Sequence, residues 1–202
     1  MTTLPSSQIG DPPWEIARYF PPQGSWSEGE YLNFNANRGI EFVDGCVEFL
    51  PMPTKTHELI ASFLYRAIFE FVAATQWGRV FYAGYRVRVR TDQYREPDVI
   101  VLRQDHFAKA GEQFTEVADL VVEVVSPDDP KRDLETKRTE YAAAGIPEYW
   151  IVDPRDQTVT VFTLPDGTNE YGEGARFTAG QQAMSMLLDG FMVNVDEVFS
   201  QD

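Results

Sequence analysis

Three short apolar runs constrain the fold of this 202-residue chain most strongly. They cover residues 98–102 (DVIVL), 119–125 (DLVVEVV) and 148–152 (EYWIV). Runs of this length that are rich in Val and Ile are typical of buried strands. Two segments with helical periodicity, Thr54–Trp77 and Lys131–Ala144, lie between and before them. Strands that alternate with helices and also form hairpins predict a mixed α/β or α+β sheet.

Local signals set the limits of the predicted elements. Apolar residues recur at spacings of three and four in Thr54–Trp77, and Gly78 is expected to end that helix. The next stretch, Arg79–Arg90, is rich in Val, Tyr and Phe and is typical of strand. Gly145 followed by Pro147 predicts the end of the second helix.

The N-terminal part contains weaker signals. Residues 1–24 hold five of the thirteen prolines and predict an irregular arm, with a short turn around Trp14–Tyr19. Ser27 and Glu30 match a capping box, so a short helix should continue to about Asn37. Residues 40–50 predict a hairpin that turns at Asp44 and Gly45. We expect residues 25–202 to form a single domain.

Charge and composition argue against several functional classes. The chain has 17 Lys and Arg against 32 Asp and Glu, a formal net charge of −15, which argues against non-specific binding to nucleic acids or anionic membranes. The positive charge collects in residues 79–103, which hold six Arg against three acids. The single cysteine, Cys46, excludes an internal disulfide and fits a cytoplasmic setting. We expect no transmembrane helix and no signal peptide.

Two carboxylates lie within or directly beside apolar strands, where a charged side chain is unusual. Glu123 interrupts its strand between Val122 and Val124, and Asp98 precedes the first residue of another strand. Two such carboxylates at neighbouring strand ends suit Mg²⁺ or Mn²⁺. The alternatives are a buried pair with an arginine for Glu123 and a turn or capping role for Asp98.

A lysine on the second helix is the third member of this set. Lys137 and Tyr141 are four residues apart and therefore share a face of the helix. A lysine beside two carboxylates and a metal would orient the attacking water or neutralise a phosphate. The alternative is a simple helix salt bridge, since Asp133 and Glu140 are four residues before and three after Lys137.

These motifs together resemble a known family. Pro97-Asp98, Glu123-Val124-Val125, Lys137 with Tyr141, and the run from Gly145 to Pro154 are similar to the Uma-two family of restriction endonucleases, in the PD-(D/E)XK nuclease superfamily. The similarity covers about residues 27–199. It implies a restriction-endonuclease-like fold, in which a mixed central sheet is flanked by helices and preceded by an N-terminal helix and hairpin.

The resemblance also implies roles for single residues. Asp98 and Glu123 would be metal ligands, together with the backbone carbonyl of Val124. The lysine of the usual motif is replaced by Val125, and Lys137 matches a displaced position of that lysine. Glu41 matches an additional catalytic acid. Beside the ligands, His57 and Tyr141 would be supporting residues, although His57 could equally be a helix-start residue with a ring that faces solvent.

An alternating arginine stripe fits the same picture. The side chains of Arg86, Arg88 and Arg90 are predicted to share one face of a strand. Successive members would be roughly 7 Å apart, a spacing that suits a phosphate backbone. The alternative is that these arginines pair with the protein's own carboxylates, including Glu41 or Glu123.

Three hypotheses remain open from the sequence. The first is a Mg²⁺- or Mn²⁺-dependent endonuclease that hydrolyses DNA phosphodiesters with a metal-activated water. The second is a nuclease-fold protein that binds or regulates without cutting. The third is a purely structural ion network of Asp98, Glu123 and Lys137. We further predict a homodimer that acts on DNA and has no membrane partner.

Overall fold

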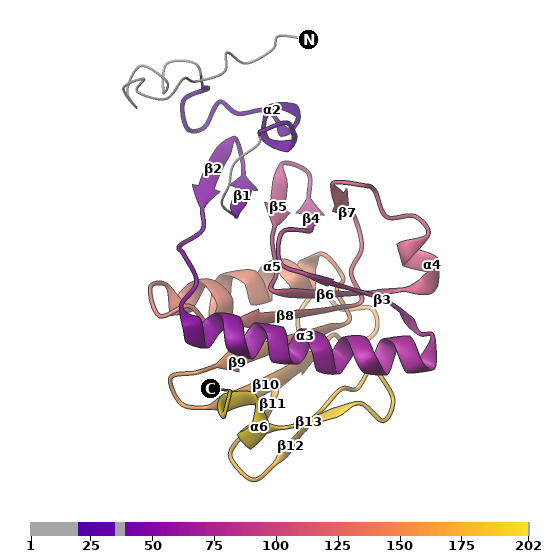
Figure 1. Ribbon diagram of the computed structural model, residues 1–202. Coiled ribbons are helices and arrows are strands. Elements are labelled where there is room, and N and C mark those ends of the chain that lie inside the picture. The colour runs from indigo at the N-terminus through magenta and orange to yellow at the C-terminus, as the bar shows by residue number, and fades with distance from the viewer. Residues whose placement is uncertain (1–19, 35–38, 202) are drawn as a thin grey trace.

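A six-stranded sheet forms the centre of the protein (Figure 1). The structure is a computed structural model that describes residues 20–34 and 39–201. Strands β8 and β9 are parallel, and the other neighbours are antiparallel. In spatial order the strands are β11 (Ala175–Phe177), β10 (Thr158–Thr163), β9 (Glu148–Asp153), β8 (Leu120–Val124), β6 (Val99–Arg103) and β3 (Gly78–Tyr82). The three apolar runs are thus adjacent central strands, as their sequence predicts.

Helices cover both faces of this sheet. Helix α3 (Lys55–Thr75) packs on one face through its apolar stripe, where it meets Leu120, Val122 and Val124 of β8. The other face packs against a π-helical turn, η1 (Arg132–Lys137), which continues as α5 (Arg138–Ala143). Because side chains alternate along a strand, Glu123 points to the same side as Val121, toward η1 and α5.

A second sheet lies above the first in Figure 1. A small aromatic core of Trp26, Tyr31, Phe42 and Tyr94 joins it to helix α2 (Glu28–Leu32). Its strands, in spatial order, are β2 (Cys46–Phe49), β1 (Ile40–Val43), β5 (Gln93–Arg95), β4 (Arg86–Arg90) and β7 (Phe114–Thr115). The capping box at Ser27 and the hairpin turn at Asp44 are both present. Helix α2 ends at Leu32 with Asn33 as its C-cap, so the prediction that it continues to about Asn37 is wrong. The predicted turn around Trp14–Tyr19 lies outside the described residues.

Two further local predictions are wrong. Arg79–Arg90 is not one strand, because a turn at Ala83 and Gly84 divides it into β3 and β4, which belong to different sheets. Gln76, not Gly78, ends α3 in the left-handed conformation. Gly78 instead starts β3, where an added Cβ would lie 1.9 Å from the carbonyl oxygen of Leu102.

The remaining elements close the ends of the domain. The short helix α4 (Gln104–Phe107) follows β6. The hairpin of β12 (Gln182–Met184) and β13 (Met192–Asn194) leads into the C-terminal helix α6 (Val195–Phe199), which packs on α3. Among the described helices, none combines the length and apolar character needed to cross a bilayer.

Candidate active site

A cavity of about 370 Å³ opens where the two sheets meet helix α3. Its lining includes residues 50–54 between β2 and α3, Asp98 directly before β6, the end of β8, the loop residues 126–129, and Arg132 and Asp133 of η1. Asp98, Glu123 and Lys137 all reach this cavity. The fold therefore brings together the three residues that the sequence singled out.

Asp98 is held at the start of β6 by two donors. Its Oδ2 accepts the backbone N–H of Val124 at 2.7 Å and lies 3.2 Å from Nε2 of His57. His57 sits in the first turn of α3, where its N–H donates to the capping hydroxyl of Thr54. Burial acts to lower the pKa of His57, but the hydrogen bond and charge of Asp98 outweigh it and raise that pKa. The ring of His57 therefore faces Asp98 in the cavity, not bulk solvent.

Glu123 is almost fully buried on β8. Its Oε1 accepts a hydrogen bond from the Tyr141 hydroxyl at 2.6 Å and lies 2.8 Å from Nζ of Lys137. Burial raises the pKa of Glu123 to about 8, and the charges of Asp133 and Asp98 add to the rise, while Lys137 opposes it. Lys137 and Tyr141, which were predicted to share a helix face, thus both contact Oε1 of Glu123.

Lys137 ends the π-helical turn and touches three carboxylates. Besides Glu123, its Nζ lies 3.2 Å from Asp133 and 3.5 Å from Glu41. Burial acts to lower the pKa of Lys137, but Glu123, Glu41 and Asp133 raise it above its ordinary value, so the side chain stays charged. Both alternatives left by the sequence are realised in part: Lys137 reaches the strand carboxylate and also pairs with Asp133, whereas Glu140 binds Arg95.

Glu41 lies deeper, on β1, and is not among the residues that line the cavity. Its Oε1 accepts the N–H of Glu96, and its Oε2 binds the guanidinium groups of Arg95 (2.6 Å) and Arg132. Burial alone would raise its pKa, but Lys137, Arg95 and Arg132 together hold that pKa at about 2. Both oxygens of this ionised carboxylate are engaged by the protein itself.

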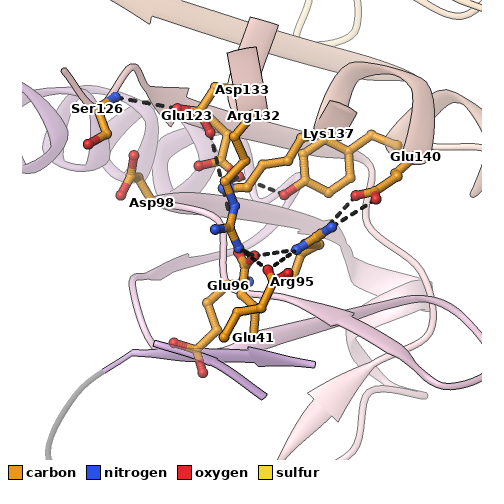
Figure 2. Close-up of polar contacts among 12 residues, drawn as sticks. Glu41, Arg95, Glu96, Asp98, Glu123, Ser126, Arg132, Asp133, Lys137 and Glu140 are labelled. Atoms are coloured by element: carbon orange, nitrogen blue, oxygen red, sulfur yellow. Dashed lines mark hydrogen bonds and ion pairs between the residues drawn. The ribbon is translucent and has the colours of Figure 1, made fainter. Parts of the chain in front are cut away.

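The residues around Glu41 form an ion network that the sequence did not reveal (Figure 2). Arg95 is buried and is held by Glu140 through two hydrogen bonds of 2.8 Å. Arg132 also binds Glu48 at 2.7 Å. An arginine within the short β5 segment was the available signal, because a buried guanidinium requires carboxylate partners. Nothing in the local pattern indicated which carboxylates those would be.

The arginine stripe on β4 is paired with the protein's own acids. Arg86 additionally lies over the ring of Tyr31. The partners are Glu96 for Arg86, Glu28 and Glu116 for Arg88, and Asp44 for Arg90. This is the alternative that the sequence left open, although the partners are not Glu41 or Glu123. A role in phosphate binding remains a prediction.

The donor set of the cavity fits a hard divalent cation. In residues 20–34 and 39–201 no hydrogen bond reaches Oδ1 of Asp98 or Oε2 of Glu123, while the other oxygen of each carboxylate is held in place. The same part of the chain contains no group of three or more His, Cys, Asp or Glu arranged for a metal. Mg²⁺ commonly uses one or two carboxylates and keeps its waters, so Asp98 and Glu123 could hold such an ion. The Val124 carbonyl as a further ligand stays a prediction.

Comparisons with known proteins agree with this architecture. A crystal structure of a putative nuclease belonging to DUF820 from Anabaena variabilis matches with a TM-score of 0.72 and 19% sequence identity, covering 90% of this chain and 99% of that one. At this identity the likeness shows the fold, and it confirms the predicted nuclease-like α+β architecture. No curated protein matches the chain.

A family model settles the membership. The model described as "Putative restriction endonuclease" matches residues 26–196, a range that includes both sheets and every residue of the cavity. That description supports nuclease function in general terms. The chain therefore belongs to the Uma2 family, as the resemblance of its motifs predicted.

Proposed function

We propose that this protein is a metal-dependent endonuclease that hydrolyses DNA phosphodiester bonds. The observation that carries the proposal is the convergence of Asp98 and Glu123 on one cavity, each with one oxygen anchored by the protein and one without a hydrogen bond among the described residues. Lys137 reaches the same cavity from η1. Family membership supports a nucleic acid as the substrate.

Each residue has a distinct part in the proposed reaction. Asp98, Glu123 and the Val124 carbonyl would hold Mg²⁺ or Mn²⁺. A cation bound there supplies a more acidic water and offsets charge on the phosphate. Lys137 stays charged, fixes the orientation of Glu123 and adds positive charge beside the phosphate. His57 fixes Asp98, and Tyr141 fixes Glu123.

Glu41 has a different part from the catalytic one that the resemblance implied. Both of its oxygens are bound to cations or to a backbone N–H, and its pKa is low. A group with so low a pKa is a poor general base. We assign Glu41 to the positioning of Lys137 and Arg132.

The second candidate is a nuclease-fold protein that binds without cutting. It is favoured by the three carboxylate contacts of Lys137, which are also what a structural ion network requires. Metal binding without cleavage of any substrate would support it.

The test is cleavage of supercoiled plasmid and single-stranded DNA with Mg²⁺ or Mn²⁺. We expect metal-dependent nicking that the Glu123→Ala variant loses by at least about a hundredfold. Glu173→Ala, which removes an exposed carboxylate far along the chain, is the matched control and should cut like the wild type. Equal cutting by the wild type and Glu123→Ala would reject the proposed site.

The predicted homodimer belongs to the same proposal, because two sites are convenient for cutting two strands. Sedimentation at micromolar concentration should give twice the chain mass of 23.0 kDa. A species of single-chain mass would reject the dimer and leave the site unaffected.

A further inference from the structure

We infer that Arg132 is the residue that grips the substrate phosphate in this cavity. The inference rests on the proposed function and assigns a residue that neither the motifs nor the family resemblance indicated. Arg132 is the first residue of η1, one turn before Lys137, and its side chain lines the cavity.

The cavity offers few cations for an anionic substrate. Its lining contains seven carboxylate side chains against Arg132, Lys137 and His57. Lys137 is buried and already has three carboxylate partners, and His57 is held by Asp98. Arg132 is held by its two carboxylate partners through Nη2 alone, which leaves its other terminal nitrogen for a phosphate, whereas the unpartnered ring nitrogen of His57, Nδ1, is buried.

The geometry of Arg132 leaves one terminal nitrogen of its guanidinium available. Its Nη2 binds Glu41 and Glu48, which fixes the guanidinium from one side. Its Nε is a buried donor with no hydrogen-bond partner, and no hydrogen bond within the described residues involves Nη1. Figure 2 shows a guanidinium nitrogen of Arg132 without a partner among the residues drawn.

This arrangement suits a phosphate better than a second structural ion pair. Because Nη2 is occupied by Glu41 and Glu48 and Nε is buried, Nη1 is the nitrogen that can donate to a phosphate oxygen, in one charge-assisted hydrogen bond. Its side chain retains 22% exposure, whereas the neighbouring Arg95 retains 4% and satisfies its donors on Glu41, Glu48 and Glu140. Glu41 and Glu48 are then positioning residues that hold Nη2 of Arg132 and leave Nη1 to the substrate.

The experiment measures binding of labelled single-stranded and duplex oligonucleotides in Ca²⁺ as a function of salt. Arg132→Met should bind about tenfold more weakly, the loss expected for one charge-assisted contact. The slope of log affinity against log salt should fall by about 0.7 to 0.9, one phosphate contact. Arg155→Met, which removes an arginine paired with Asp153 outside the cavity, should change neither quantity.

A second variant covers the case in which Arg132→Met does not fold. Arg132→Lys keeps the charge but has no second terminal nitrogen to reach a phosphate while the first binds Glu41 and Glu48, so it should lower affinity with an unchanged salt slope. Wild-type affinity in Arg132→Lys, or a wild-type slope in a folded Arg132→Met, would overturn the inference while metal-dependent cleavage by the wild type still supported the proposed function. A wild-type protein that neither binds nor cleaves nucleic acid would overturn both.

Discussion

Glu41 and Glu123 occupy two ends of the same buried cluster and differ in the number of cations that face them. Both are almost completely removed from solvent, and both contact Lys137. Glu41 faces three cations, and its pKa is held at about 2. Glu123 faces one cation and the charges of Asp133 and Asp98, and burial raises its pKa to about 8.

The difference separates structural stabilisation from chemistry within a single network. A buried carboxylate that is fully compensated holds elements together, and here it joins β1 to β5 and η1. A buried carboxylate with too little compensation costs stability and persists where function requires it. By this criterion we propose Glu123 as the metal ligand and Glu41 as part of its support.

The largest effect should come from removing the compensated carboxylate. Glu41→Ala leaves Arg95 and Arg132 without their central partner, and breaking such a buried pair costs about 3–5 kcal/mol. Denaturant unfolding at neutral pH measures this loss. Glu123→Gln is the matched variant and should lie within about 1 kcal/mol of the wild type or above it, because it removes an undercompensated acid. Equal losses of unfolding free energy in both variants would contradict the proposed difference between Glu41 and Glu123.

Acid should weaken the Glu41 end of the network. The folded-state pKa of Glu41 is about 2 and its ordinary value is 4.5, so its contribution is present above pH 4.5 and is lost as the pH falls toward 2. The free energy of unfolding of the wild type should therefore fall by about 3 kcal/mol relative to that of Glu41→Gln across this interval. Paired unfolding curves at each pH measure this difference. A constant gap would show that Glu41 is not compensated as described.

The Glu123 end should respond to pH with the opposite sign. Its pKa of about 8 exceeds its ordinary value of 4.5, so the folded state binds the extra proton between these limits. The free energy of unfolding of the wild type should therefore fall relative to Glu123→Gln as the pH rises from 4.5 to 8. The same paired unfolding series measures this trend, and a rise in place of the fall would contradict the raised pKa.

The smallest effect concerns the hydroxyl on Glu123. Tyr141→Phe removes the 2.6 Å hydrogen bond to Oε1 and should cost about 1.5–3 kcal/mol near pH 9, where the carboxylate is ionised. Tyr149→Phe is the matched control, since its hydroxyl donates to the uncharged carbonyl of Asp133 and should cost about 0.5–1.5 kcal/mol. Thermal or denaturant unfolding decides the order, and a larger loss in Tyr149→Phe would reverse it.

Local pattern predicted those parts of the fold that local physics determines. The period of α3, the capping box at Ser27 and the apolar strands β6, β8 and β9 follow from spacing and residue type alone. The division of Arg79–Arg90 between two sheets did not follow, because a strand's composition does not specify its partner. The π-helical turn within Lys131–Ala144 was likewise hidden, since its residues read as ordinary helix.

The sequence predicted the central residues of the site but not the cations that pair with Glu41. A carboxylate inside an apolar strand and a lysine with a tyrosine four residues later are visible in sequence, and they meet in the fold. The cations around Glu41 come from β5 and η1, 54 and 91 residues away in the chain. Such long-range pairs are fixed by tertiary packing, which a single sequence does not display.

The most direct test of the account is calorimetric titration with Mn²⁺ of the wild type, Glu123→Gln and Glu41→Gln. Because a metal binds the deprotonated carboxylate, wild-type affinity should rise as the pH passes about 8, with proton release below it. Glu123→Gln should lose binding, whereas Glu41→Gln, which changes no residue of the cavity lining, should retain it at a temperature where the variant is folded. Binding that survives in Glu123→Gln and disappears in Glu41→Gln would contradict the assignment of the two carboxylates.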